Sequence, residues 1–277
     1  MEAGGVRVSA IGLGTWQFGS RAWGYGERYA VSTARQIVRR ALDLGVTLID
    51  TAEIYAFGRS ERIVGAAIHD RRDDAFVATK LYPALPVAPV AVWCGRSSAR
   101  RLAVDRIDLY QLHAANPVVP IAAAMRGMAR LRDEGVVRHV GVSNVGLGQW
   151  READAALGSP VLSNQVRYSL LVRAPEQELL GFAQANERLL IAHSPLAQGL
   201  LSGRYDGGSV PAGARARSPL FLPETLESAR PLLDVLREIG DARGVQSATV
   251  ALAWLIRRPH VVAIPGAHSL AQLEANV

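Results

Sequence analysis

The basic side chains of this sequence are almost all arginine: of 31 lysines and arginines, a single one, Lys80, is a lysine. It ends the apolar run Phe76 to Lys80, which predicts a buried strand whose last residue points out of the end of a sheet. Barrel enzymes present their chemical groups from that position. Lysine brings a compact ammonium that can polarise one neighbouring oxygen, whereas arginine brings a wide fork that keeps its proton. We interpret Lys80 as a residue that takes part in the chemistry of a site. The alternative is an ordinary solvated lysine.

Other polar residues follow the ends of neighbouring predicted strands. Asp50 comes after Thr47 to Ile49, His113 comes after Leu109 to Leu112, and Tyr55 lies in the loop five residues beyond Asp50. Because strand ends converge on one rim of a barrel, an acid, an ammonium, a phenol and an imidazole would share a pocket. The set predicts a proton-transfer site.

The chemistry of these groups suits carbonyl reduction or its reverse. Adding hydride to a carbonyl makes an alkoxide that needs a proton, and a phenol with a pKa of about 10 is a reluctant donor. An ammonium beside it, that of Lys80, would stabilise the phenolate of Tyr55 and lower its pKa. Asp50 would keep Lys80 charged and oriented, and His113 would donate a hydrogen bond to the substrate oxygen.

Each of these residues also has a simpler interpretation. A tyrosine in a loop is usually surface packing, and an aspartate before Thr-Ala usually caps a helix. A histidine at a strand end is more often a satisfied structural group. The conjunction favours chemistry, since four compatible groups at the ends of three early strands would be an uncommon accident.

The elements that must position these residues alternate along the chain. Apolar runs of strand length are separated by segments with helical spacing, such as Ser32 to Leu44, Ser60 to His69 and Ile121 to Glu134. Eight such units favour an α/β fold of the (β/α)₈ TIM-barrel class over an open doubly wound sheet. The predicted strands are Ser9 to Leu13, Val46 to Ile49, Phe76 to Thr79, Ile107 to Leu112, His139 to Val142, Val161 to Asn164, Leu189 to Ala192 and Val261 to Ile264.

Later segments carry three further expectations. Pro175 to Asn186 and Glu227 to Arg243 read as helices, and the proline-rich stretch Tyr82 to Pro89 is expected to shorten the third helix. The irregular stretch Gly203 to Pro223 would overhang the active face as a candidate lid. After the first strand, Gly12 and Gly14 lack the third glycine of a dinucleotide fingerprint.

Composition narrows the function classes. The length of 277 residues, with 49% hydrophobic and 20% charged residues, favours one domain over residues 1–277. The net charge of +6 comes from dispersed arginines, so no nucleic-acid partner is expected. Neither a signal sequence nor a membrane-spanning stretch is recognised, which predicts a cytoplasmic protein. Cys94 is the one cysteine, and no spacing of Cys and His suggests a metal.

The motifs together closely resemble the aldo-keto reductases. Asp50 to Tyr55 reads Asp-Thr-Ala-Glu-Ile-Tyr, Ala78 to Lys80 reads Ala-Thr-Lys, and Ile107 to His113 reads Ile-Asp-Leu-Tyr-Gln-Leu-His. The resemblance spans nearly the whole chain in the order of the family, continuing through Gly141 to Asn144, Ser163 to Gln165, Ser194 to Gly203 and Ala263 to Ala267.

This resemblance implies a barrel that reduces aldehydes and ketones with NADPH, without metal. Asp50, Tyr55, Lys80 and His113 would form the catalytic tetrad, with Tyr55 as proton donor, and NADH is the alternative cofactor. The implied cofactor-binding residues are Gly14, Thr15, Asp50, Ser143, Asn144, Gln165, His193, Ser194, Leu196, Gly199, Gly266, His268, Ser269, Gln272 and Asn276.

The cofactor residues divide by the part of the dinucleotide they would hold. Ser143, Asn144 and Gln165 would bind the nicotinamide carboxamide, because amide and hydroxyl groups satisfy its donors and acceptors. Ser194 to Leu201 would follow the pyrophosphate, where a glycine allows close backbone approach and main-chain amides donate. Gly266 to Asn276 would surround the adenosine phosphate and adenine.

Several positions depart from the pattern of the family. His193 stands where an aromatic residue, commonly tyrosine, stacks on nicotinamide. Near the 2′-phosphate the family often has arginine or lysine, and this chain has His268, Ser269 and Gln272; an arginine fork binds phosphate better than a neutral imidazole. Ala275 replaces a glutamate that contacts adenine in many relatives.

The substrate side carries fewer signals. Trp16 and Trp23 are expected to line an apolar substrate pocket together with Tyr55 and His113, and core packing is the alternative. The chain ends at Val277, inside the expected eighth helix, so the C-terminal helix and loop are expected to be truncated and the pocket more open. A small carbonyl compound is the expected substrate. The alternative function is a cofactor-binding, redox-sensing auxiliary subunit with little turnover.

Overall fold

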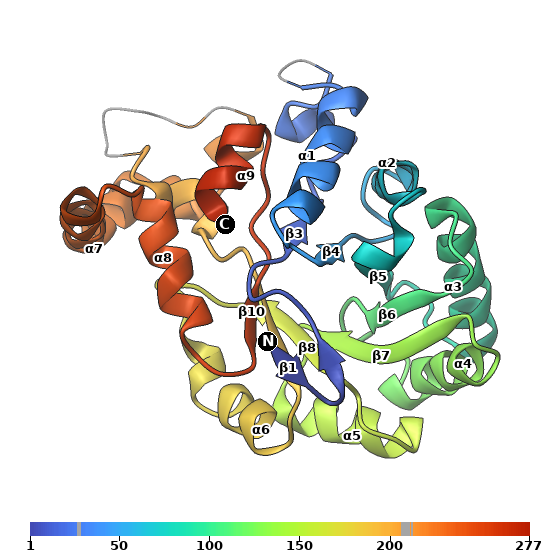
Figure 1. Cartoon of the computed structure of the whole chain (residues 1–277). Helices are drawn as coiled ribbons and strands as arrows, with labels where there is room; N and C mark the ends of the chain where they lie inside the picture. Colours follow the sequence, from blue (N-terminus) through green and yellow to red (C-terminus); the bar gives the residue numbers. More distant parts are fainter. Residues whose placement is uncertain (27–28, 206–210, 212) are drawn as a thin grey trace.

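The apolar runs form one parallel sheet that curls into a barrel (Figure 1). Within the part of the chain that the structure describes, eight parallel strands pair in chain order from β3 to β10. The first and last strands meet at a seam, where the N–H of Gly14 donates to the carbonyl of Pro265 and the N–H of Gly12 to that of Ala263. The predicted (β/α)₈ architecture is confirmed. A computed structural model provides these coordinates and describes residues 1–26, 29–205, 211 and 213–277.

The strands are short and buried on both faces, as expected where helices cover a parallel sheet. At the seam, a Cβ on Gly14 would come within 2.8 Å of the Ile264 carbonyl oxygen, so the close approach of the two strands requires glycine. The barrel strands are β3 (Leu13–Gly14), β4 (Leu48–Asp50), β5 (Phe76–Leu81), β6 (Ile107–Leu112), β7 (Val137–Ser143), β8 (Ser163–Arg167), β9 (Leu189–His193) and β10 (Val261–Ala263).

The limits of several predicted strands need correction; for example, the strand predicted at Val46 to Ile49 is β4, and the one predicted at Phe76 to Thr79 runs on to Leu81. The first strand is much shorter than Ser9 to Leu13, because this segment makes only a single bridge, at Ile11, before β3 begins. The strand predicted at Val161 to Asn164 begins at Ser163 and runs on to Arg167, and the one predicted at His139 to Val142 is longer at both ends. These differences arise because a strand begins and ends where it can pair with both neighbouring strands. An apolar run in the sequence does not specify that pairing.

An N-terminal hairpin was not expected from the sequence. Strands β1 (Glu2–Ala3) and β2 (Val6–Arg7) pair antiparallel. Ala3, Val6 and Val8 are buried in one cluster with the side chains that fill the barrel interior, including Leu48 and Leu109. Figure 1 shows the hairpin across the barrel, beside the N-terminus. It therefore closes the amino-terminal end of the barrel with apolar side chains.

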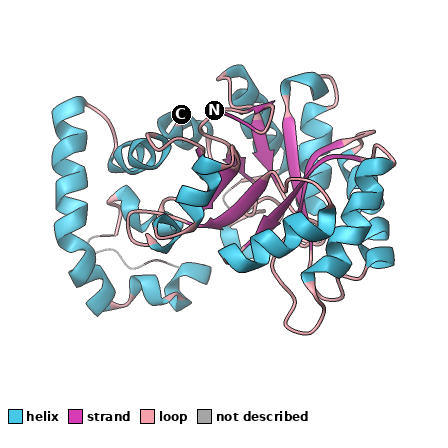
Figure 2. Ribbon diagram, turned by 90° about the horizontal axis from the view of Figure 1, so that it is seen from below, coloured by secondary structure: helices cyan, strands magenta, loops and turns pink. Residues whose placement is uncertain are grey.

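Helices surround the strands on the outside (Figure 2). Their inner faces follow the helical period; in α1, for example, Ala34, Ile37, Val38, Ala41 and Leu42 are buried. Among the described residues no helix is long and apolar enough to cross a membrane. The helices are α1 (Val31–Asp43), α2 (Arg59–Ile68), α3 (Ala88–Leu102), α4 (Ile121–Asp133), α5 (Leu147–Leu157), α6 (Leu179–Ala185), α7 (Pro223–Arg243), α8 (Ser247–Ile256) and α9 (Leu270–Asn276).

Two expectations about helices were wrong. The proline-rich stretch does not shorten the third helix: α3 has 15 residues and carries Pro89 in its first turn, where the missing N–H costs nothing. The helix predicted over Pro175 to Asn186 is divided into a 3₁₀ turn, η3 (Ala174–Glu176), and the seven-residue α6. Of the candidate lid, residues 206–210 and 212 lie outside the described residues; the rest includes the 3₁₀ turns η5 (Gly213–Arg217) and η6 (Pro219–Phe221).

Candidate active site

Three neighbouring strands bring the predicted acid, ammonium and imidazole to one end of the barrel. Asp50 is the last residue of β4, Lys80 lies one residue before the end of β5, and His113 directly follows β6. The register pairs Asp50 with Ala78, and Lys80 with Gln111. Because all these strands are parallel, their carboxyl ends form a single rim, and the loop after β4 brings Tyr55 over it.

Lys80 is fully buried, and all three of its N–H groups have partners. Nζ donates to Oδ1 of Asp50 at 2.6 Å, to the carbonyl oxygen of Thr51 at 2.8 Å and to the hydroxyl of Tyr55 at 3.3 Å. An ammonium has three donors and no acceptor, so this arrangement uses it completely. Burial lowers the pKa of Lys80, but the charges of Asp50 and Tyr55 and their hydrogen bonds outweigh it and raise the pKa overall. Lys80 is therefore held as a cation.

The carboxylate of Asp50 is shared between that ammonium and two amides. Its second oxygen, Oδ2, accepts from Nε2 of Gln165 at 2.8 Å and from Nε2 of Gln111 at 3.4 Å. Asp50 is only 2% exposed, and charged groups this deeply buried need such a set of donors. The main-chain carbonyl of Asp50 accepts from the hydroxyl of Thr15 at 2.9 Å.

The effect of burial on Tyr55 differs from the sequence expectation. Burial raises the pKa of Tyr55, Lys80 lowers it and Asp50 raises it, and the net direction is upward. Lys80 lowers the pKa of Tyr55, as expected. The prediction that the pKa of Tyr55 is lowered overall was wrong for the protein alone, because the loss of hydration destabilises the phenolate more than Lys80 stabilises it. Tyr55 is therefore protonated at neutral pH. Since its oxygen accepts from Lys80, its own hydrogen is directed elsewhere.

His113 is neutral for the same reason. Burial lowers its pKa to about 3, and the charge of Lys80 and the neighbouring His193 add to this effect. Its ring meets that of Tyr55 edge to face, with centroids 5.9 Å apart. Nδ1 is buried and has no hydrogen-bond partner among the described residues. A neutral imidazole carries one N–H, so His113 can donate a single hydrogen bond without titrating near pH 7.

The residues expected to hold a nicotinamide lie next to this cluster and are linked to one another. Nδ2 of Asn144 donates to the carbonyl of His113 at 3.0 Å, and its Oδ1 is 2.9 Å from Nε2 of His193. An amide oxygen only accepts, so Nε2 of His193 carries the proton. The hydroxyl of Ser143 donates to the main chain of Gln165 at 2.8 Å. Burial lowers the pKa of His193 to about 4, so this ring is neutral as well.

The loop after β9 has an unusual backbone. Ser194, Ala197, Gln198 and Gly199 all have positive φ angles, between 48° and 100°. Leu196 precedes the 3₁₀ turn η4 (Ala197–Ser202) that contains the last three of these residues. The N–H of Ala197 donates to the carbonyl of Ser194 and that of Gly199 to the carbonyl of Leu196, so these residues form a tight turn at the end of β9.

Arg215 also meets this loop, a contact that the sequence did not indicate. It comes from the candidate lid, and its Nε donates to the carbonyl of Gln198 at 2.7 Å. The same guanidinium lies over the ring of Trp23, 4.8 Å from its centroid. Trp23 packs against Trp16 with ring centroids 4.9 Å apart, and Trp16 is about half exposed. The two tryptophans predicted to line the substrate pocket thus form one aromatic pair at the lid.

The segment from Gly266 to Asn276 borders the seam of the barrel. Gly266 forms a bridge with Gly14, and Ser269 caps α9 by accepting from the N–H of Gln272. The side chain of Gln272 in turn accepts from the N–H of His268 at 2.9 Å. The amide of Asn276 donates to the carbonyl of Gly266 at 3.5 Å. Three of the residues expected near the 2′-phosphate are therefore engaged in shaping the start of α9.

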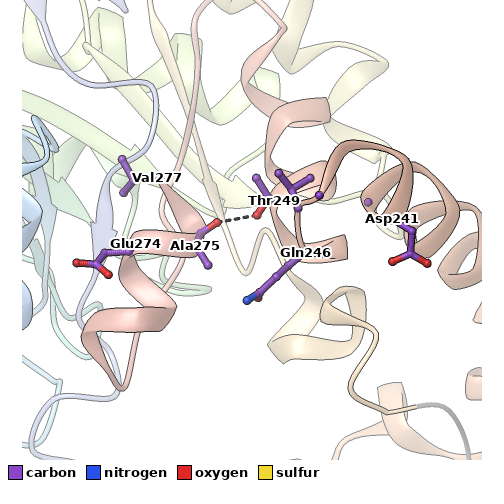
Figure 3. A pocket seen from close by; sticks show the side chains of 9 residues that line it. Asp241, Gln246, Thr249, Glu274, Ala275 and Val277 are labelled. Atoms are coloured by element: carbon purple, nitrogen blue, oxygen red, sulfur yellow. Dashed lines mark hydrogen bonds between the residues drawn. The ribbon is translucent and has the colours of Figure 1, made fainter.

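A cavity of about 570 Å³ opens on the other side of α9, between α7, α8 and α9 (Figure 3). Ala275 lies at its edge, and its carbonyl accepts from the hydroxyl of Thr249 at 2.7 Å. Asp241, Gln246, Glu274 and Val277 line it further. Ala275 thus faces a cavity whose volume lies within the range of ligand pockets, about 300–1,000 Å³.

Sequence reasoning missed a further set of buried hydroxyls below Tyr55. Ser60 begins a helical pattern, and this pattern gives no sign of the contacts that its side chain makes. Its Oγ is 2.8 Å from Oγ1 of Thr15 and 2.9 Å from Oγ1 of Thr51, and it donates to the main chain of Thr15. These bonds hold the loop of Tyr55 onto the first two barrel strands.

Comparison with known proteins identifies the family. A sequence model described as "Aldo/keto reductase family" matches residues 10–277. The chain belongs to the aldo/keto reductase family. An uncharacterised oxidoreductase of Mycobacterium tuberculosis is 55% identical over 271 residues, covering 98% of this chain and 84% of that protein. Members of the family are oxidoreductases that use NAD(P)H, and this chain is one of them.

More distant aldo/keto reductases share the whole of the described barrel. Methylglyoxal reductase YeaE of Escherichia coli is 34% identical over 99% of this chain and 86% of its own length. An aldo/keto reductase of Klebsiella pneumoniae, solved in complex with NADP and acetate, superposes with a TM-score of 0.79 at 32% identity. The match covers 99% of this chain and 87% of that one.

Proposed function

We propose that this aldo/keto reductase reduces small aldehydes and ketones to alcohols with NADPH, and that Tyr55 donates the proton. One observation carries the proposal: the buried ammonium of Lys80 uses its three N–H groups on Asp50, the main chain of Thr51 and the hydroxyl of Tyr55. This contact gives the phenol a fixed cation at 3.3 Å and leaves its hydrogen free to be donated.

The described residues fit a nicotinamide dinucleotide. The tight turn from Ser194 to Gly199 would follow the pyrophosphate, and the guanidinium of Arg215 supplies positive charge beside it. The polar group of Ser143, Asn144 and Gln165 suits a carboxamide. The fit is weaker at the 2′-phosphate, where the segment 266–276 contains no arginine or lysine. The relative from Klebsiella pneumoniae was solved with NADP, and this supports NADPH as the cofactor.

The residues of the chain would act as follows, while the bound cofactor supplies a hydride to the carbonyl carbon. Nε2 of His113 donates a hydrogen bond to the carbonyl oxygen and sets its direction, because Nδ1 is enclosed. As charge builds on that oxygen, the O–H bond of Tyr55 breaks and its proton forms the hydroxyl of the alcohol. Lys80 stabilises the phenolate left behind, and Asp50 keeps Lys80 in place until Tyr55 regains a proton from solvent.

The test is oxidation of NADPH, followed by absorbance, with methylglyoxal, other aldehydes and quinones. We expect turnover by the parent protein and a loss of about 10²–10⁴-fold in Tyr55→Phe, the usual value of a positioned proton donor. A fluorescence titration should show that the variant binds NADPH as the parent does, and NADPH more tightly than NADH. Tight NADPH binding by a parent protein that turns over none of these compounds would favour the auxiliary-subunit function instead.

A further inference from the structure

A buried group of charges lies behind the catalytic rim, between α2 and α3, which are neighbours in the outer ring (Figure 1). Arg101, near the end of α3, donates from Nε to the carboxylate of Glu61 in α2. Its Nη2 lies 3.7 Å from Oε2 of Glu53, in the loop that carries Tyr55, and donates to Ser98 at 3.0 Å. One guanidinium thus binds two carboxylates from the segment on either side of Tyr55.

The path of Arg101 to these carboxylates depends on a glycine. Gly58, which precedes α2, has a φ of +76°, and a Cβ there would meet Cδ of Arg101 at 2.6 Å and Nε at 2.7 Å. The side chain therefore crosses the backbone at the point where the Tyr55 loop turns into α2. This close crossing couples the position of α3 to that of the loop.

One carboxylate contacts β5 before Lys80, and the other contacts the residue that directly follows β5. Glu61 is fully buried, and its Oε1 accepts from the hydroxyl of Thr79 at 2.7 Å, one residue before Lys80. Oε1 of Glu53 accepts from the N–H of Tyr82 at 2.6 Å, two residues beyond Lys80. The end of β5 is thus attached to the Tyr55 loop at one point and to α2 at another.

The charges of this group make Arg101 necessary for both attachments. Burial raises the pKa of Glu53, and the neighbouring charge of Glu61 raises it further, while the N–H of Tyr82, the thiol of Cys94 and the charge of Arg101 act the other way. Without Arg101, two close and largely buried carboxylates would face each other with no cation between them, and would separate or take up a proton.

From these contacts we propose that Arg101 is a positioning residue, which sets the distance between Lys80 and Tyr55 through Glu53 and Glu61. The proposal rests on the proposed function of the Lys80–Tyr55 pair. That contact, at 3.3 Å, is the longest of the three that Lys80 makes, and it joins β5 to the Tyr55 loop. It is the one that a small shift between these two segments would lengthen.

The experiment compares Arg101→Met with Arg100→Met. Arg100 is the adjacent residue of α3, it is exposed, and its guanidinium bonds Ser97, so the control removes the same charge away from Glu53 and Glu61. We expect Arg101→Met to lower kcat by about 10- to 100-fold, because displacements of an ångström can cost that much. KM for NADPH should not change. Arg100→Met should behave as the parent.

The pH profile separates positioning from simple loss of structure. Lys80 lowers the pKa of Tyr55, so a longer contact must raise that pKa, and the alkaline limb of kcat should move to higher pH in Arg101→Met. Arg101→Lys, which keeps the charge but lacks the fork, should recover part of kcat. An Arg101→Met protein whose kcat and alkaline limb equal those of Arg100→Met would overturn the proposal.

A second variant covers the case in which Arg101→Met does not fold. Glu53→Gln keeps an oxygen that can accept from the N–H of Tyr82, and it removes the charge that pairs with Arg101 and that accepts from the thiol of Cys94. It should fold, lower kcat and shift the alkaline limb in the same direction; an unchanged limb overturns the inference. A parent protein that reduces no carbonyl compound would contradict the proposed function, whereas an active parent with unaffected variants would contradict this inference alone.

Discussion

Replacing Lys80 by methionine tests the electrostatic basis of the site most directly, because methionine keeps much of the volume and removes the charge. At an effective dielectric constant of about 20, a unit charge 3.3 Å from the phenolate oxygen of Tyr55 stabilises it by about 5 kcal/mol. About half of that charge develops in a midway transition state, which gives about 2.5 kcal/mol. The expected loss in kcat therefore lies between about 70-fold and about 5,000-fold.

The same substitution leaves Asp50 buried without its cation. Removing one partner of a buried ion pair typically costs about 3–5 kcal/mol in the free energy of unfolding. The double variant Lys80→Met with Asp50→Asn removes the unpaired charge, so it should regain stability without regaining activity. Urea unfolding monitored by circular dichroism measures the first quantity, and NADPH oxidation at saturating methylglyoxal measures the second.

Two results would refute the reasoning. One is a folded Lys80→Met protein with a kcat within about two-fold of the parent, since that is under 0.5 kcal/mol and far below the calculated range. The other is a double variant that regains activity together with stability. In that case Lys80 would be a structural partner of Asp50, and the phenol of Tyr55 would need no cation.

The remaining predictions concern the two neutral histidines. His113→Leu should lower kcat by about 10²–10³-fold, as loss of one preorganised donor does. Because the pKa of His113 is about 3, no limb of the parent pH–rate profile between pH 5 and 8 should disappear in this variant. Stability should also fall in acid: His113 and His193 have pKa values of about 3 and about 4 when folded, against 6.5 ordinarily, so below pH 6.5 the unfolded chain binds more protons. Each histidine then lowers the free energy of unfolding by about 1.4 kcal/mol per pH unit between these values. Urea titrations from pH 7 to pH 4.5 should show a shallower decline in the free energy of unfolding of His113→Leu than in that of the parent, and an equal slope in both proteins would contradict this assignment.

The sequence predicted the barrel because the alternation of apolar runs and helical segments is repeated eight times, and a parallel sheet covered by helices follows from it. Elements with little apolar periodicity were missed. The hairpin of Glu2–Ala3 and Val6–Arg7 is two residues per strand, too short for any pattern to show. The division of the helix at Pro175 depends on packing, and nothing local marks it beyond the proline itself.

The grouping of Asp50, Lys80 and His113 was predictable, because residues at the carboxyl ends of parallel strands must share a rim. The pKa values of the residues in this group were less predictable from the sequence. The pKa of Tyr55 depends on how much water the fold removes, which a spacing of residues does not contain. The role proposed for Arg101 was equally hidden, since Glu53, Glu61 and Arg101 lie far apart in sequence and carry charges that normally mark a surface.

The burial of Lys80 has a practical consequence, because it is the only ε-amine in the chain. Acylating reagents of the kind used to label surface lysines find no exposed ε-amine among the described residues of the folded protein, and react there only with an α-amine. A second acyl group on the protein then shows that Nζ of Lys80 has become exposed, because the rim has opened or the chain has unfolded. Mass spectrometry of the intact protein can thus follow exposure of the catalytic cation without introducing any probe.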